Sequence, residues 1–211
     1  APLAPLVEDG EHGMTMLDLC KSRVFWLLML MMMCAGASEQ AVSQWASTFA
    51  ERGLGVSKTV GDLAGPMAFA VLMGSARAFY GKFGDRIALD KFMIGSAVLC
   101  IMSFLCISLS PSAVLSLFGC AVCGVWVGIM WPGSFSRASA SIRNGGTALF
   151  ALLALAGDVG CSGGPTLVGY ISSLASDDLK KGILAAVIFP VLLAVGILVL
   201  KKNSAVHRAG I

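Results

Sequence analysis

The sequence predicts an all-α protein embedded in a membrane, a bundle of six transmembrane helices. Of its 211 residues, 57% are hydrophobic and 13% are charged, against about 25% charged in soluble domains, and the mean hydropathy is +0.85. Six apolar stretches are each long enough to cross a hydrocarbon core of roughly 30 Å, which takes about 20 helical residues. None of them alternates strictly between apolar and polar residues, so we expect helices, which satisfy their own backbone hydrogen bonds in lipid, rather than a barrel.

The six predicted spans occupy most of the chain. They cover residues 24–49, 60–80, 88–109, 113–135, 147–173 and 183–200. The segment before them, residues 1–22, is acidic, contains prolines and starts without a methionine. We therefore expect it to be a cytoplasmic linker between two halves of a larger protein, and the chain to be a fragment or a processed product. Residues 23–201 then form one six-helix domain, and residues 202–211 form a cytoplasmic tail.

The basic residues predict the orientation. An even number of spans places both termini on one side of the membrane. The connections and flanks on that side carry Lys21, Arg23, Lys82, Arg86, Lys91, Arg137, Arg143, Lys201, Lys202 and Arg208, whereas the opposite loops carry Arg52, Lys58, Lys180 and Lys181. By the positive-inside rule, this bias predicts a multi-pass protein of the cytoplasmic membrane with both termini cytoplasmic. The net charge of +3 is dispersed, so nucleic acid is not an expected partner.

The first span carries polar residues that we expect to bind a solute. Glu39 lies about 15 residues into the span, roughly 22 Å along its axis, and an ionisable side chain inside a membrane costs about 2.5 to 3.5 kcal/mol on insertion scales. Gln40 and Gln44 are one turn apart on one helix face, and Trp45 offers a stacking surface. The pattern predicts a polar wall for a hydroxyl-rich or amphipathic solute. The alternative is that Glu39 ends a shorter buried helix and meets water.

A charged motif follows the second span. Residues 81–86 read GKFGDR, which resembles the G-x-x-x-D-R signature of a cytoplasmic loop in the major facilitator superfamily. Gly81, Asp85 and Arg86 match, whereas residues 88–90 depart from the pattern, which usually has a glycine and a basic pair there. In that family the glycine permits a tight turn, and the two charged side chains pair with each other and with helix ends.

The position of the motif extends the resemblance to nearly the whole chain. Six spans, cytoplasmic termini and this motif after the second span are together what the carboxy-terminal six-helix half of such a transporter shows. Residues 36–45, with a later element that ends at Arg77, most resemble the sugar-porter-like, fucose-permease-like bacterial branch. Arg77 is then expected to be a gate or latch residue near the loop rather than a solute ligand.

The resemblance implies secondary active transport of a small organic solute by alternating access. A sugar or related metabolite is favoured, and proton coupling is one option. The site of such a transporter lies between two halves, so the implied partner is a missing amino-terminal six-helix half or, if the chain is complete, a second copy in a homodimer. A non-transporting membrane sensor or assembly protein with the same fold stays as the alternative.

Glycine and proline interrupt the later part of the bundle. They cluster at Gly65-Pro66, at Trp131-Pro132-Gly133, in residues 160–165 and at Pro190. Two interpretations stay open, close helix packing by small residues and hinges that line a path. Asp158, in the middle of the fifth span, is expected to face the cavity, where a protonatable carboxylate could couple transport to a proton. Alternatively, it pairs with backbone groups freed at the glycine-rich kink.

The cysteines and histidines give little support to a catalytic or metal site. Cys120-x-x-Cys123 has the spacing of a redox or zinc motif, but it lies in an apolar helix without a histidine or second cysteine pair to complete it. We therefore expect packing residues there, and no metal or cofactor. His12 and His207 lie outside the spans, which argues against an intramembrane hydrolase and for a protein that is not an enzyme.

Overall fold

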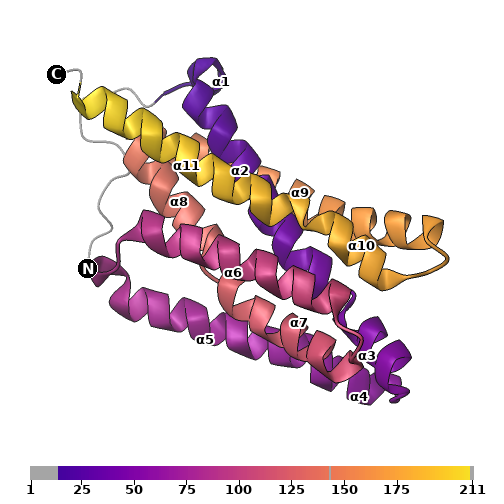
Figure 1. Cartoon of the computed structure of the whole chain (residues 1–211). Coiled ribbons are helices and arrows are strands. Elements are labelled where there is room, and N and C mark those ends of the chain that lie inside the picture. The colour runs from indigo at the N-terminus through magenta and orange to yellow at the C-terminus, as the bar shows by residue number, and fades with distance from the viewer. Residues whose placement is uncertain (1–13, 143, 210–211) are drawn as a thin grey trace.

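The computed structural model describes residues 14–142 and 144–209, without the side chains of residues 53, 54, 85 and 203–209. Within this part of the chain, the helical segments long and apolar enough to cross a membrane are Arg23–Arg52, Lys58–Phe83, Leu89–Leu109, Ala113–Ser141, Gly146–Leu174 and Leu179–Lys202. The predicted all-α membrane bundle of six helices is thereby confirmed (Figure 1). The fourth span is the one that extends furthest beyond its prediction, to Ser141 instead of residue 135.

Several spans consist of more than one helix. The first comprises α2 (Arg23–Ser43) and α3 (Ala46–Leu54); the second comprises α4 (Lys58–Asp62), the π-helical turn η1 (Leu63–Met67) and α5 (Ala68–Phe83); the third is α6 (Leu89–Leu109). The fourth comprises α7 (Ala113–Val127) and α8 (Met130–Ser141), the fifth is α9 (Gly146–Leu174), and the sixth comprises α10 (Leu179–Ala186) and α11 (Ile188–Ala209). A 3₁₀ turn, η2 (Gly84–Arg86), joins α5 to α6.

The prolines explain most of these interruptions. Pro132 and Pro190 stand in the first turns of α8 and α11, where a missing N–H is tolerated. Pro66 lies in the π-helical turn of the second span, and such turns are single-turn irregularities within otherwise regular helices. Because the fourth span restarts as a new helix before Pro132, it continues as a helix past the proline to its longer end.

The centre of the bundle is the contact between α2 and α9, the most extensive contact between two helices. Glycines make it close. A Cβ on Gly36 would overlap the backbone oxygen of Gly157, and a Cβ on Gly160 or Gly164 would overlap the backbone oxygen of Met33 or Ala37. For these positions, the packing interpretation of the glycine cluster is therefore correct. In Figure 1, α11 crosses α2 and lies beside α6, and α7 and α5 follow below α6.

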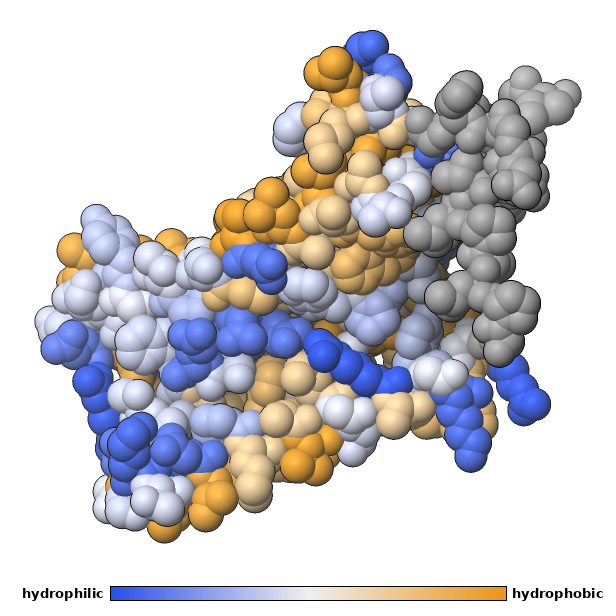
Figure 2. Space-filling model, turned by 180° about the vertical axis from the view of Figure 1, so that it is seen from behind, coloured by the Kyte–Doolittle hydropathy of each residue, from blue (hydrophilic) through white to orange (hydrophobic). Residues whose placement is uncertain are grey.

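The second and fifth spans are the least buried of the six. On α9 the exposed face carries polar groups at helical spacing, since Asp158, Ser162 and Thr166 are all exposed and each hydroxyl donates to the carbonyl four residues earlier. Figure 2 shows a band of hydrophilic residues across the middle of one face, with apolar surface on either side. A lipid-facing surface would be apolar at this depth, so this face requires protein or water against it.

The last part of the predicted linker folds onto the bundle. Helix α1 (Met16–Lys21) begins at Thr15, whose hydroxyl oxygen accepts a hydrogen bond from the Asp18 N–H at 3.3 Å. Leu19 is fully buried in a cluster that includes Phe25 and Leu28. Residues 1–13 of the predicted linker, and the side chains of residues 203–211 in the predicted tail, lie outside the described residues.

Candidate functional site

Arg77 of α5 connects three spans. Its Nη2 donates to Glu39 Oε2 of α2 at 2.9 Å, which forms an ion pair. Its Nε donates to the carbonyl oxygen of Gly128 at 3.3 Å, just after α7 ends. In a regular helix that carbonyl would accept from the N–H of residue 132, but Pro132 has no N–H. One guanidinium therefore satisfies both a buried carboxylate and a backbone acceptor that a proline has left without its helical partner.

The ion pair forms part of the wall of an open hollow of about 420 Å³, lined by Glu39, Arg77, Trp131, Pro132 and Phe135. The Arg77 side chain is 39% exposed and the Glu39 side chain 11% exposed, so the hollow meets mainly the cation. Arg77 Nη1 makes no hydrogen bond within the described part of the chain and remains available to a ligand. The hollow thus offers hydrogen-bond donors, a carboxylate and two aromatic surfaces.

The aromatic side of the hollow is held by ring contacts. The Trp131 ring lies 6.2 Å from that of Phe135, and the Phe135 ring lies 5.8 Å from that of Phe150 on α9. Trp131 Nε1 is buried and has no hydrogen-bond partner among the described residues. An unpaired indole N–H beside a hollow is a group that a polar solute or a water molecule would satisfy.

The other polar residues predicted on the first span lie apart from the hollow. The helix breaks at Gln44 and Trp45, between α2 and α3. Trp45 Nε1 donates to the backbone oxygen of Pro165 at 3.2 Å, and its ring packs against Gly169. This residue therefore joins the first span to α9. Gln44 is exposed at the break and Gln40 is half-buried, and neither lines the hollow.

Asp158 lies on the exposed face of α9. Its side chain makes no hydrogen bond or ion pair within the described residues, which differs from the predicted alternative of a carboxylate paired with freed backbone groups. Of the two predicted carboxylates, Glu39 lines the hollow and Asp158 does not.

The loop motif has a different geometry from the one expected. Gly81 lies inside α5 rather than at a turn, and the turn is closed by the Ile87 N–H, which donates to the Gly84 carbonyl at 3.1 Å. Arg86 is exposed, and the side chain of Asp85 lies outside the described residues. Arg77, expected to be a gate or latch residue near this loop, donates its described hydrogen bonds to Glu39 of α2 and to the Gly128 carbonyl just after α7.

A second ion pair at this end of the bundle was missed by the sequence reasoning. Asp90 at the start of α6 lies 3.1 Å from Arg137 of α8, measured from Oδ1 to Nε, and both side chains are largely buried. The available signal was the opposite charge of Asp90, at the start of the third span, and Arg137, near the end of the fourth. Antiparallel spans bring these two ends to the same side of the membrane.

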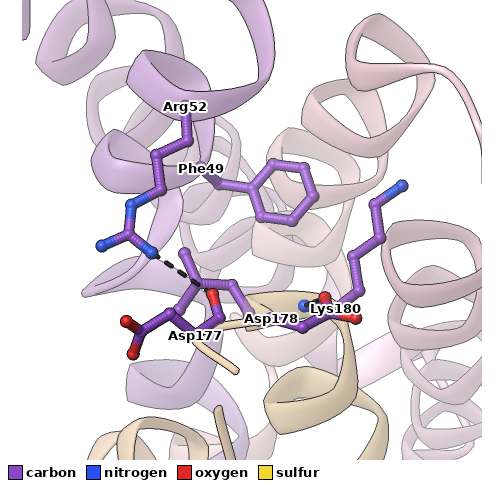
Figure 3. Close-up of a pocket in the computed structure, with 6 residues that line it drawn as sticks. Phe49, Arg52, Asp177, Asp178 and Lys180 are labelled. Atoms are coloured by element: carbon purple, nitrogen blue, oxygen red, sulfur yellow. Dashed lines mark hydrogen bonds between the residues drawn. The ribbon is translucent and has the colours of Figure 1, made fainter. Parts of the chain in front are cut away.

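Helix α3 and the start of α10 with the connection before it form a smaller pocket of about 210 Å³ at the other end of the bundle, lined in part by Phe49 and shown in Figure 3. Arg52 donates to the backbone oxygen of Asp177 at 3.3 Å, and Lys180 donates to the backbone oxygen of Ser110 at 2.5 Å. Asp178 caps α10. This loop fastens the ends of the first, third and sixth spans together.

The Cys120-x-x-Cys123 motif does not gather ligands. Cys123 Sγ lies 3.8 Å from Cys100 Sγ inside the core. Among the described residues, no group of three or more His, Cys, Asp or Glu is placed to hold a metal ion.

The comparisons with known proteins give one match. A family model described as the Major Facilitator Superfamily matches residues 2–165, well over half of the chain. No curated protein matches, and no solved structure matches.

Proposed function

The chain belongs to the major facilitator superfamily, and from that premise we propose that it is the carboxy-terminal half of a secondary active transporter that moves a small organic solute by alternating access. The family and the six spans make it a membrane transporter in general terms. The half-domain, the solute and the mechanism are the proposal.

The observation that carries this proposal is the hollow beside the Arg77–Glu39 ion pair. Ionisable groups inside membrane spans are expensive and mark solute or ion pathways by default. Here they lie in an open hollow rather than in a closed core. The guanidinium supplies donors and the carboxylate supplies acceptors, which suits a hydroxyl-rich solute, and the Trp131 ring offers a surface for its less polar face.

The exposed polar face supports the half-domain interpretation. The least buried spans are the second and the fifth, and the fifth presents Asp158, Ser162 and Thr166. A second six-helix unit against this face would cover those groups and close the hollow from the open side. This unit is the missing amino-terminal half or, in a complete chain, a second copy.

The resemblance of residues 36–45 to the fucose-permease-like branch favours a sugar or related metabolite as the solute. Proton coupling is supported by the two carboxylates near the hollow, Glu39 and Asp158, of which Glu39 would lose its counter-ion whenever a solute drew Arg77 away. The bias of basic residues supports a location in the cytoplasmic membrane with both termini cytoplasmic.

The test is uptake of a panel of radiolabelled hexoses by the full-length protein in proteoliposomes. We expect Arg77→Gln and Glu39→Gln each to lower uptake at least tenfold, because each removes a hydrogen bond to a charged group, worth about 1.5 to 3 kcal/mol. The matched control is Glu51→Gln, the same change on the same span but at a half-buried carboxylate outside the hollow, which faces the exposed Lys58 and accepts from the Ser47 hydroxyl. This variant should keep uptake near the wild-type rate.

The non-transporting alternative predicts a different pattern. In cells that depend on the full protein, Glu39→Gln, Gln44→Ala and Asp158→Asn would then leave solute uptake unchanged. That result, with intact folding of each variant, would contradict the proposed function.

A further inference from the structure

A second hollow lies on the outside of the bundle, between α5, α6 and α7. It has a volume of about 330 Å³, and its walls include Leu72, Ala76 and Phe79 of α5, Phe92 of α6 and Trp126 of α7. Both α5 and α6 pack extensively against α7, whereas their contact with each other is slight. The gap between these neighbouring helices forms a groove, which we call the α5–α6 groove.

The α5–α6 groove is apolar and runs along about two turns of α5. Its one hydroxyl group, on Ser75, is already used in a hydrogen bond to the Val71 carbonyl at 2.8 Å. From Leu72 to Phe79, the first and last residues of α5 in its wall, the helix rises roughly 10 Å at about 1.5 Å per residue, which is about a third of a 30 Å hydrocarbon core. Near that end, the rings of Tyr80 and Phe92 stack at 6.3 Å and close the groove.

Three basic residues lie just beyond the closed end of the α5–α6 groove. Lys82 follows Phe79 by three residues on the same face of α5, Lys91 precedes Phe92 on α6, and Arg86 lies in the turn between the helices. All three side chains are exposed. Among the described residues, none of the ion pairs involves them, and the nearby carboxylate of Asp90 is paired with Arg137.

We propose that the α5–α6 groove binds an anionic phospholipid, with an acyl chain against Phe79 and Trp126 and the phosphate at Lys82, Lys91 and Arg86. An apolar slot about two helical turns long ends at three exposed cations. None of the three forms an ion pair among the described side chains, and Lys82 Nζ lies 5.5 Å from the Phe83 ring. The bias of basic residues assigns that end to the cytoplasmic side, which is the side where anionic lipids are concentrated. The proposal requires only that the protein is in a membrane, so it stands apart from the proposed function.

The second six-helix unit is the competing occupant of the α5–α6 groove. The distribution of polar groups favours a different surface for that unit. The hollow beside Arg77 and the polar face of α9 carry the charges and hydroxyls that protein must cover, whereas the walls of the α5–α6 groove carry no charge. Ordinary annular lipid would cover the groove without selecting a headgroup. The cations predict selection, because each basic residue near the surface raises the affinity for anionic lipid about fivefold.

Trp126 in the wall is a built-in reporter. The full-length protein is reconstituted into phosphatidylcholine vesicles that contain increasing fractions of dibrominated phosphatidylglycerol or, in parallel, dibrominated phosphatidylcholine. Subtracting the fluorescence of a Trp126→Phe variant isolates the quenching of Trp126 itself. We expect half-maximal quenching at a mole fraction of brominated phosphatidylglycerol at least fivefold lower than that of brominated phosphatidylcholine.

Two charge variants complete the test. Lys82→Gln with Lys91→Gln should abolish the difference between the two lipids, whereas Lys58→Gln with Lys180→Gln, the same loss of charge at the other end of the bundle, should retain it. Each variant is first required to match the wild-type elution profile and helical circular dichroism. Equal quenching by both lipids in the wild type would overturn the proposal in favour of annular lipid. Absence of quenching by either lipid would overturn it in favour of a groove covered by protein.

Discussion

The close contact between α2 and α9 can be tested with two glycines on one helix. A Cβ on Gly160 would overlap the Met33 carbonyl oxygen and lie 3.0 Å from the Ala37 nitrogen, whereas a Cβ on Gly163 would meet nothing within 4 Å. Both changes to alanine gain the same helix propensity, about 0.5 to 1 kcal/mol, so this gain cancels between the variants. The difference that remains is the overpacking at Gly160, about 1 to 3 kcal/mol. Backbone atoms cannot move aside as side chains do, so we expect a value of about 2 kcal/mol or more.

Thermal unfolding in detergent measures this difference. The buried cysteines, such as Cys100, Cys120 and Cys123, become reactive on unfolding and can be followed with a thiol-reactive dye. At roughly 2 to 4 °C per kcal/mol for a chain of this size, we expect Gly160→Ala to unfold at least about 4 °C below Gly163→Ala. Equal unfolding temperatures in the 211-residue chain would refute the close approach of α2 and α9. If Gly163→Ala lowers the unfolding temperature of the full-length protein but not that of the 211-residue chain, another part of the protein packs against Gly163.

Two further predictions concern Pro132 and Asp18. Pro132→Ala restores an N–H that can compete for the Gly128 carbonyl, so Arg77 should lose its hydrogen bond to that carbonyl. We expect uptake by the full-length protein to fall several-fold, while the unfolding temperature stays the same or rises. Unchanged uptake would contradict this prediction. The hydrogen bond from the Thr15 hydroxyl holds the pKa of Asp18 below its ordinary value of 3.8. Its contribution to the stability of α1 is therefore present above about pH 3.8 and lost as the pH falls through the lower, folded-state pKa. Amide exchange of residues 16–21, corrected for intrinsic rates, should rise at low pH in the wild type but not in Asp18→Asn.

The fold class and the six spans were predictable from the sequence because the length of an apolar stretch is a local property. The ends of the spans were less predictable, since the fourth span continues through Pro132 to Ser141 by starting a new helix. The position of Glu39 as a charge inside the first span was also predictable, but its partner was not. Arg77 lies 38 positions away, and only the packing of both α5 and α2 against α7 brings its guanidinium to Glu39.

The break at Pro132 and the cation of Arg77 stabilise each other, and both lie in the wall of the hollow. A carbonyl without a partner inside a membrane costs several kcal/mol, and a cation without a partner there is also costly. At the break between α7 and α8, the guanidinium of Arg77 removes both costs by donating to the Gly128 carbonyl and to Glu39. Pro132 leaves a carbonyl that can bind the Arg77 guanidinium, and the guanidinium in turn stabilises the Glu39 carboxylate of α2 beside it. Since Pro132 also lines the hollow, the polar wall stands at the place where the fourth span is broken.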